Sequence, residues 1–310
     1  MARPKKYESP AVKQRAYRER KSRELRNTEA LQNEDKTAAQ MKNPPLRYYG
    51  GKWRIASWII QYFPPHQAFV EPFCGAANIL FQKAPSPFEV INDLNGDVVN
   101  FFDVLRSRSD ELIRAIQLTP FSREEHRRAH LPADDSLERA RRFYIRSRQS
   151  YGSGEGEYNT GWRFQAGSAR GARVIEEWNR TDHLWEAARR LKQVQIESDT
   201  AIKCIRRFDT PETLFYVDPP YMFETRHSDE ERYAIEMSNE EHSQLADVLH
   251  SVKGKVILSG YWSELYQVLY ADWWVTSKQS RTNGNNQKEE FLWISPAARQ
   301  MSDLPLFRQE

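Results

Sequence analysis

Seven short apolar runs, most of them separated by stretches with helical periodicity, constrain the fold of this chain more than any other feature. They lie at 68–70, 89–91, 194–196, 214–217, 255–258, 273–276 and 291–294. Alternation of this kind is typical of a doubly wound, mainly parallel sheet. The last two runs are joined by a polar loop with Asn283-Gly284 and no helix, so we expect them to pair antiparallel at one edge. The sequence therefore predicts an α/β fold.

The expected helices include 55–62, 98–105 and 242–252, the last introduced by Ser238 and Glu241 in a capping-box pattern. The segment 119–192 interrupts the alternation. It has helical patterns at 136–148 and 173–191 around an irregular, glycine-containing stretch, and such long stretches are usually functional or mobile. We interpret the segment as an inserted module. The expected divisions are a polar arm at 1–43, one half of the main domain at 44–118, the insert at 119–192, the other half at 193–297 and a tail at 298–310.

Positive charge is concentrated in two segments of the chain, whose formal net charge is +3. Residues 1–26 carry a net charge of +7 and residues 119–192 carry +4, so the remainder is acidic at −8. This distribution is expected where the basic segments contact a polyanion, although solvated helix faces would give the same pattern. We expect the arm to add affinity for nucleic acid without sequence preference; the alternative is that residues 11–26 dock on protein.

Other features exclude several classes of protein. No apolar run approaches the roughly 20 residues that a transmembrane helix needs, and no signal peptide is recognisable, so we expect a cytoplasmic protein that does not contact membranes. Cys74 and Cys204 lie far apart and form no metal-binding pattern, so we expect neither a disulfide nor a bound metal. We also expect a monomer.

Two of the predicted strands end in residues suited to a nucleoside ligand. The run at 68–70 leads through Glu71 and Phe73 into a turn at Gly75, where a missing side chain lets backbone and ligand approach closely. One glycine is a weak signal, and an ordinary turn would look the same. Asp93 ends the next strand, 18 positions later, where an acid often binds ribose hydroxyls. Alternatively, Asp93 caps the following helix.

The strongest motif is Asp218-Pro219-Pro220-Tyr221, at the end of an apolar strand. Both prolines fix φ and lack an N–H, so the backbone carbonyls after Asp218 point in set directions. The carboxylate and the Pro219 carbonyl are two acceptors for an amine on which positive charge develops, such as adenine N6. Tyr221 can stack on a flat base. A structural turn with the same four residues is the alternative interpretation.

These motifs, in this order, resemble the Dam-like (D12 class) family of DNA adenine-N6 methyltransferases over residues 45–297. The residues that carry the resemblance are Gly50-Gly51-Lys52, Glu71 to Ala76, Asp93-Leu94-Asn95 and Asp218 to Tyr221. The resemblance implies a Rossmann-like sheet that binds S-adenosylmethionine, with the target-recognition module inserted at 119–192. It implies a site-specific enzyme that methylates N6 of a flipped adenine in double-stranded DNA, as in phage or restriction–modification systems.

Site roles follow from the same resemblance. It places Tyr48 and Lys52 along the cofactor, together with Glu71, Phe73 and Gly75 of the second motif. It implies that Asp93 binds the ribose, that Asp199 accepts a hydrogen bond from the adenine amine of the cofactor, and that Asp218 serves both cofactor and target base. The chain departs from the family in having Tyr48-Tyr49 where the family often has a tryptophan, which leaves open which ring packs on the cofactor.

The insert lacks the stretch with which Dam-like enzymes read GATC, so the target sequence cannot be inherited from them. Arginines interleaved with aromatic residues in this segment are suited to phosphates and base edges, and a tyrosine can fill the gap left by a flipped base. Periodicity favours Phe143 and Tyr144 as core. The candidate DNA-binding residues are Arg139, Arg142, Arg146, Arg148 and Tyr151.

Three alternatives remain open: an adenine methyltransferase acting on RNA, a cytosine-N4 enzyme, and a non-catalytic DNA-binding homologue. Asp218 favours adenine, because cytosine-N4 enzymes usually carry serine there. An intact Asp218 and Lys52 favour catalysis.

Overall fold

The computed structural model describes residues 41–151, 161–164, 167–222, 235–281 and 287–300. The chain divides into two units, Met1–Gln40 and Met41–Glu310, and every described residue belongs to the second. The predicted arm therefore lies almost wholly outside the described residues, as does the Asn283-Gly284 turn.

A seven-stranded mixed sheet forms the centre of the second unit, with the strand order β3-β2-β1-β4-β5-β7-β6. The first five strands of this order are parallel, and β7 runs antiparallel to both β5 and β6, which confirms the predicted fold class and antiparallel edge. The strands are β1 (Ala68–Glu71), β2 (Phe88–Asn92), β3 (Val194–Glu197), β4 (Thr213–Val217), β5 (Lys255–Gly260), β6 (Trp274–Arg281) and β7 (Gln287–Ile294).

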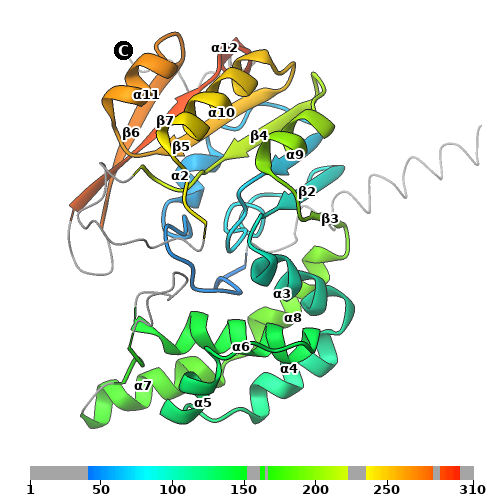
Figure 1. The fold of residues 1–310 in the computed structure, drawn as a ribbon, viewed down its shortest axis with the longest axis vertical. Coiled ribbons are helices and arrows are strands. Elements are labelled where there is room, and N and C mark those ends of the chain that lie inside the picture. The colour runs from blue at the N-terminus through cyan, green and yellow to red at the C-terminus, as the bar shows by residue number, and fades with distance from the viewer. Residues whose placement is uncertain (1–40, 152–160, 165–166, 223–234, 282–286, 301–310) are drawn as a thin grey trace, which may run out of the picture. The chain divides into compact units, whose positions relative to one another are not determined.

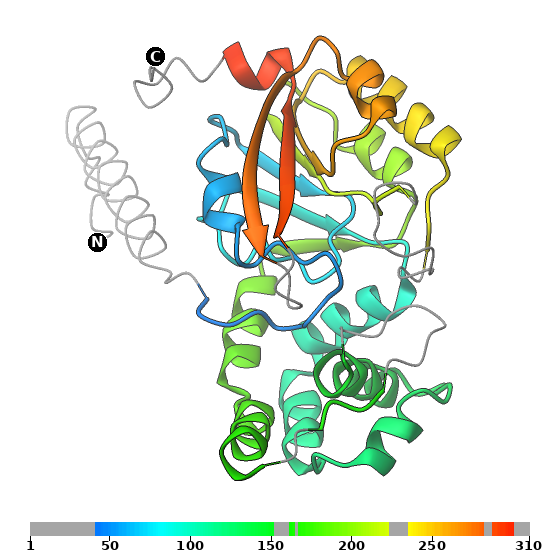
Figure 2. The ribbon, with the colours of Figure 1, turned by 90° about the vertical axis from the view of Figure 1, so that its left-hand side faces the viewer.

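Side chains of β1 alternate between two apolar cores because successive strand residues point to opposite faces of a sheet. Phe69 packs in a core with α2 and α3, whereas Val70 packs in a core with α9, α10 and α11. Figure 2 shows α10 and α11 on one side of the strands and α2, in blue, on the other. These helices are α2 (Ala56–Ile60), α3 (Gly96–Ser107), α9 (Ala201–Arg207), α10 (Asn239–Ser251) and α11 (Glu264–Leu269). The short helix α12 (Pro296–Gln300) follows β7.

The segment between β2 and β3 is helical beyond α3, and Figure 1 shows its helices grouped together. Phe143 and Tyr144 are buried there, as predicted. The predicted helix at 173–191 is wrong in one respect, because it is two helices. Arg180 adopts an extended backbone that ends α7, and Trp178 at that end donates a hydrogen bond to the carbonyl of Thr119 at 2.9 Å. The helices are α4 (Ser109–Leu118), α5 (Arg123–Arg128), α6 (Ser136–Gln149), α7 (Ser168–Asn179) and α8 (Asp182–Leu191).

Helix α10 begins with the predicted capping box, in which Ser238 and Glu241 each bind the backbone N–H of the other. Within the described residues, no helix combines the length and apolar character needed to cross a bilayer.

Candidate active site

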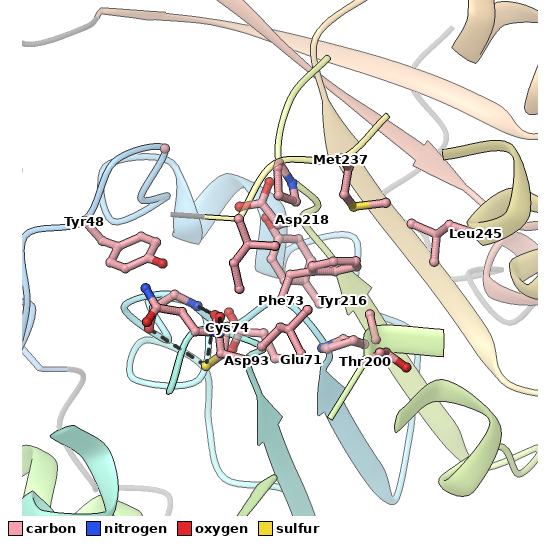
Figure 3. Close-up of a pocket in the computed structure, with 18 of the residues that line it drawn as sticks. Tyr48, Glu71, Phe73, Cys74, Asp93, Thr200, Tyr216, Asp218, Met237 and Leu245 are labelled. Atoms are coloured by element: carbon pink, nitrogen blue, oxygen red, sulfur yellow. Dashed lines mark hydrogen bonds between the residues drawn. The ribbon is translucent and has the colours of Figure 1, made fainter. Parts of the chain in front are cut away.

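The carboxyl ends of β1, β2 and β4 meet at one edge of the sheet and line a cavity of about 480 Å³. Open α/β sheets bind ligands at this edge, where the strand order reverses, which here is between β1 and β4. Figure 3 shows Asp218 and Asp93 on opposite sides of this space, with Tyr48 at one end. Of the residues predicted from sequence, the cavity is lined by Tyr48, Lys52, Glu71, Phe73, Gly75, Asp93, Asp218 and Pro220.

Gly75 makes a close turn at the end of β1. Its φ is +46°, a left-handed conformation that favours glycine. A Cβ atom added at this position would lie 2.7 Å from Cε1 of Tyr48. The turn is tied to β2, because the N–H of Gly75 donates to Oδ2 of Asp93 at 2.8 Å. Gly75 therefore brings the Tyr48 ring and the Asp93 carboxylate together at the cavity.

Asp93 is held by backbone donors and does not cap the helix that follows. Its Oδ1 accepts from the N–H of Asn95 at 2.9 Å, whereas the N-cap of α3 is Asn95, which accepts from Asp97. Burial raises the pKa of Asp93, and the hydrogen bonds from Asn95 and Gly75 oppose that rise. Glu71, at the end of β1, is buried more completely. Burial raises its pKa well above the ordinary value, and the charge of Asp218 adds to the rise.

Asp218 is fixed by a donor on each carboxylate oxygen. Ser259 on β5 donates to Oδ1 at 2.8 Å, and Lys52 donates to Oδ2 at the same distance. Ser259 also contacts the hydroxyl of Tyr216 at 2.9 Å. Each carboxylate oxygen can accept a second hydrogen bond, so Asp218 is oriented by the protein and still able to accept from a ligand.

Tyr221 is buried in this structure and lies outside the cavity lining. Its side chain is buried, its ring centroid lies 4.2 Å from that of Tyr261, and its hydroxyl donates to Oε1 of Glu290 at 2.7 Å. Lys52 donates to the same hydroxyl. Neither Tyr221 nor Pro219 lines the cavity. Stacking of Tyr221 on a base stays a prediction.

Lys52 lies between two carboxylates, and the second of them, Glu290, was assigned no role in the site from sequence. The Nζ atom of Lys52 is 2.8 Å from Asp218 and 3.5 Å from Glu290. Burial lowers the pKa of Lys52, but the two carboxylates more than offset this and the net shift is upward. Burial and the charge of Asp218 raise the pKa of Glu290 to about 7, against the opposing charge of Lys52.

Asp199 does not line the cavity, although its neighbours Thr200 and Ile202 do. Its carboxylate forms ion pairs with Arg207 at 3.0 Å and Lys203 at 3.4 Å. The predicted role of Asp199 toward the cofactor stays a prediction.

The arginines predicted to bind DNA have partners inside the protein, and none of them lines the cavity. Arg139 and Arg146 both bind Asp97 at the start of α3, at 2.5 and 2.6 Å. Arg142 pairs with Glu138 at 2.7 Å, and Arg148 donates to the ring of His183 at 2.8 Å. Tyr151 is exposed. Two of these contacts join α6 to the start of α3, and DNA binding by these residues stays a prediction.

An exposed aromatic surface lies near Tyr151 in the chain and was not predicted. The rings of Trp162 and Phe164 are stacked with centroids 6.0 Å apart, and the guanidinium of Arg123 lies 4.8 Å from the first and 5.3 Å from the second. Phe164 is 50% exposed. The sequence holds no periodic signal that would join Arg123 on α5 to residues about 40 positions later.

Comparison with known proteins gives one family. Residues 48–284 match the sequence model described as D12 class N6 adenine-specific DNA methyltransferase. The chain is 29% identical over 91 residues to the DNA N-6-adenine-methyltransferase of Escherichia phage P1, covering 29% of this chain and 12% of that protein. It is also 29% identical over 70 residues to the DNA adenine methylase of Escherichia coli (strain K12), and this match covers 23% of this chain and 25% of that protein.

A longer match is to the Type II methyltransferase M1.LlaDCHI of Lactococcus lactis subsp. cremoris, 26% identical over 261 residues, which covers 78% of this chain and 89% of that protein. The matched segments of the phage and Escherichia coli proteins are thus a quarter or less of their lengths.

Proposed function

Because the chain belongs to the family of D12 class N6 adenine-specific DNA methyltransferases, we propose that it transfers a methyl group from S-adenosylmethionine to N6 of adenine in DNA. One observation carries the proposal. The carboxylate of Asp218, held by Lys52 and Ser259, lies at the same cavity as Glu71 and Asp93. An acceptor for an amine therefore adjoins a space suited to a nucleoside.

The cavity residues fit S-adenosylmethionine in size and in chemistry. A cavity of about 480 Å³ is in the range of small-molecule sites. Gly75 leaves open a position that a Cβ would fill, and Oδ1 of the buried Asn78 has no hydrogen-bond partner among the described residues. Asp93 would accept from ribose hydroxyls, and Tyr48 and Phe73 would pack on flat or apolar parts of the ligand. When bound, S-adenosylmethionine supplies an electrophilic methyl group on a positively charged sulfur.

The protein acts on the target base through Asp218 and the backbone after it. The lone pair of the adenine amine is delocalised into the ring, so positive charge develops on N6 as it attacks. Asp218 lines the cavity and would accept one amine hydrogen, stabilise that charge and receive the proton that N6 gives up. The Pro219 carbonyl, which lies outside the cavity lining in this structure, is the candidate acceptor for the second hydrogen. Pro219 and Pro220 keep the backbone after Asp218 rigid, because their φ angles are fixed.

An adenine within a duplex cannot reach this cavity unless it leaves the base stack, and the helical segment supplies candidate contacts for that step. Trp162, Phe164 and Arg123 form a stacked, cationic surface of the kind that binds unstacked bases. This surface and Tyr151 support the assignment of the segment between β2 and β3 to target recognition. We propose double-stranded DNA as the partner.

Mass spectrometry of the modified nucleoside tests the proposal. The protein is incubated with labelled S-adenosylmethionine and with DNA or RNA, and the nucleic acid is digested to nucleosides. We expect N6-methyldeoxyadenosine from DNA. Asp218→Ala should abolish transfer, because the lost acceptor costs roughly 3 kcal/mol or more at the transition state. The matched change Asp103→Ala, at an exposed acid on α3, should leave it intact.

The other outcomes identify the alternatives. N4-methyldeoxycytidine would mean a cytosine enzyme, and label in RNA alone would mean an RNA enzyme. DNA binding without transfer would mean a non-catalytic homologue. Near-normal turnover in folded Asp218→Ala would overturn the mechanism.

A further inference from the structure

Glu290 reaches the active-site edge because of the direction of its strand. The parallel strands end at this edge, and β7 runs antiparallel to β5, so β7 crosses the edge midway along its length. In the register of the two strands, Phe291 pairs with Gly260, the last residue of β5. Glu290 is 4% exposed, and its neighbour Glu289 is exposed and bonded to Ser277. A buried carboxylate therefore lies beside Asp218 for a topological reason.

A single ammonium group is shared between these two carboxylates. Nζ of Lys52 lies 2.8 Å from Asp218 and 3.5 Å from Glu290, and it also donates to the carbonyl of Gly50 at 2.8 Å. Glu290 also accepts a hydrogen bond from the Tyr221 hydroxyl at 2.7 Å. Lys52 Nζ lies 4.7 Å from the centre of the Tyr221 ring. The charge of Glu290 therefore affects the strength of the ion pair between Lys52 and Asp218.

We propose that Glu290 is a positioning residue that sets the strength of Asp218 as the acceptor for the target amine, by competing with it for the ammonium of Lys52. The inference rests on the proposed function and adds a residue to it. Glu290 does not line the cavity and acts through Lys52.

The direction of the effect follows from electrostatics. With Glu290 ionised, Lys52 is divided between two acceptors and a second negative charge faces Asp218, so Asp218 binds a developing positive charge more strongly. With Glu290 protonated, Lys52 forms its ion pair with Asp218 alone, and the ammonium charge weakens Asp218 as an acceptor. Since burial and Asp218 raise the pKa of Glu290 to about 7, the change falls near neutral pH. Methyl transfer should therefore accelerate as pH rises through that range.

Other titratable groups around Glu290 come from several elements. Lys52 precedes α2, Asp218 and Tyr221 follow β4, and Tyr261 follows β5. The negative charges of Glu290 and Asp218 add to the rise that burial causes in the pKa of both Tyr261 and Tyr216, so these phenols stay neutral. On β6, Lys278 is opposite Glu290 in register, and its ammonium lies 5.9 Å from the Trp58 ring. Within this set, Glu290 is the group whose change of charge near pH 7 is supported.

Single-turnover methyl transfer, measured with saturating S-adenosylmethionine and duplex DNA between about pH 5.5 and 9, tests the inference. We expect the wild-type rate to rise through a transition near neutrality. Glu290→Gln should lose that transition and be at least about tenfold slower at the alkaline end, because the ionic interaction that Glu290 makes with Lys52 over 3.5 Å is, inside a protein, larger than the energy of a tenfold rate change. Glu289→Gln, its exposed neighbour, should follow the wild-type profile.

Two results would overturn the inference: a wild-type rate without a transition near neutrality, or Glu290→Gln with the wild-type midpoint. Glu290→Asp keeps the carboxylate and should keep a transition, whatever its midpoint, so it serves if the glutamine variant fails to fold. If Glu290 only supports Tyr221 structurally, Glu290→Gln lowers the rate equally at every pH, which also overturns the inference. Failure of the proposed function is distinct, because wild-type protein would then form no N6-methyldeoxyadenosine at any pH.

Discussion

Replacing Gly75 by alanine should weaken cofactor binding through the Tyr48 ring. The added Cβ would lie 2.7 Å from Cε1 and 2.8 Å from Cδ1 of Tyr48, closer than real Cβ contacts, so the ring must move. The φ of +46° adds a backbone cost. Ala77, two residues on, already has a φ of 49°, which shows that the turn tolerates one such residue. The displacement of Tyr48 is therefore the decisive part of the change.

The magnitude has two parts. A non-glycine residue in the left-handed region costs about 1–2 kcal/mol. Moving the Tyr48 ring away from the ligand removes a contact of about 1 kcal/mol, which corresponds to a dissociation constant raised roughly fivefold. We expect the free energy of unfolding to fall by about 2 kcal/mol, with the steric part adding to the backbone part.

Urea unfolding and calorimetric titration with S-adenosylmethionine measure the two parts separately. Gly161→Ala is the matched control, because an added Cβ there meets no atom within 4 Å and the backbone has no positive φ. It should change neither quantity. A Gly75→Ala protein that is folded at the assay temperature and binds S-adenosylmethionine as tightly as the wild type does would contradict this prediction.

Two further predictions concern single side chains. Asp93→Ala should raise the dissociation constant of S-adenosylmethionine about 10- to 100-fold, since a hydrogen bond to a charged group contributes about 1.5–3 kcal/mol; an unchanged titration would leave Asp93 with only its backbone contacts at Gly75 and Asn95. Burial and the charge of Arg148 lower the pKa of His183 from 6.5 to about 3, so the folded protein keeps this ring neutral. Its contribution to stability is complete above pH 6.5 and is lost as pH falls toward 3. Chemical denaturation across this range should show a shallower acid slope in His183→Gln, by up to about 1.4 kcal/mol per pH unit, and equal slopes would contradict the assignment.

The strands could be predicted from sequence because each is a compact apolar run. β1 to β5 match the predicted runs to within two residues. The last two strands, Trp274–Arg281 and Gln287–Ile294, extend well beyond their apolar runs. They pair with each other over their whole length, so ladder hydrogen bonds sustain them where the side chains are polar. The break at Arg180 was missed because neither glycine nor proline marks it.

The cavity residues could be predicted where a motif follows a parallel strand, as with Glu71, Asp93 and Asp218. Glu290 could not, because its place depends on the register of an antiparallel strand that only the folded sheet defines. The arginines of α6 show a different limit. The same spacing suits phosphate contacts and ion pairs within the protein, and in this structure Arg139 and Arg146 both pair with Asp97.

The position of β1 between β2 and β4 has a consequence during synthesis of the chain. Ala68 pairs with Thr213, so about 145 residues must be added before β1 gains its second neighbour, which takes on the order of ten seconds at ribosomal speeds. The helices α3 to α8 emerge within that interval, and their contacts with one another need nothing from β4. The nascent protein should therefore present its helical segment before the cavity edge exists.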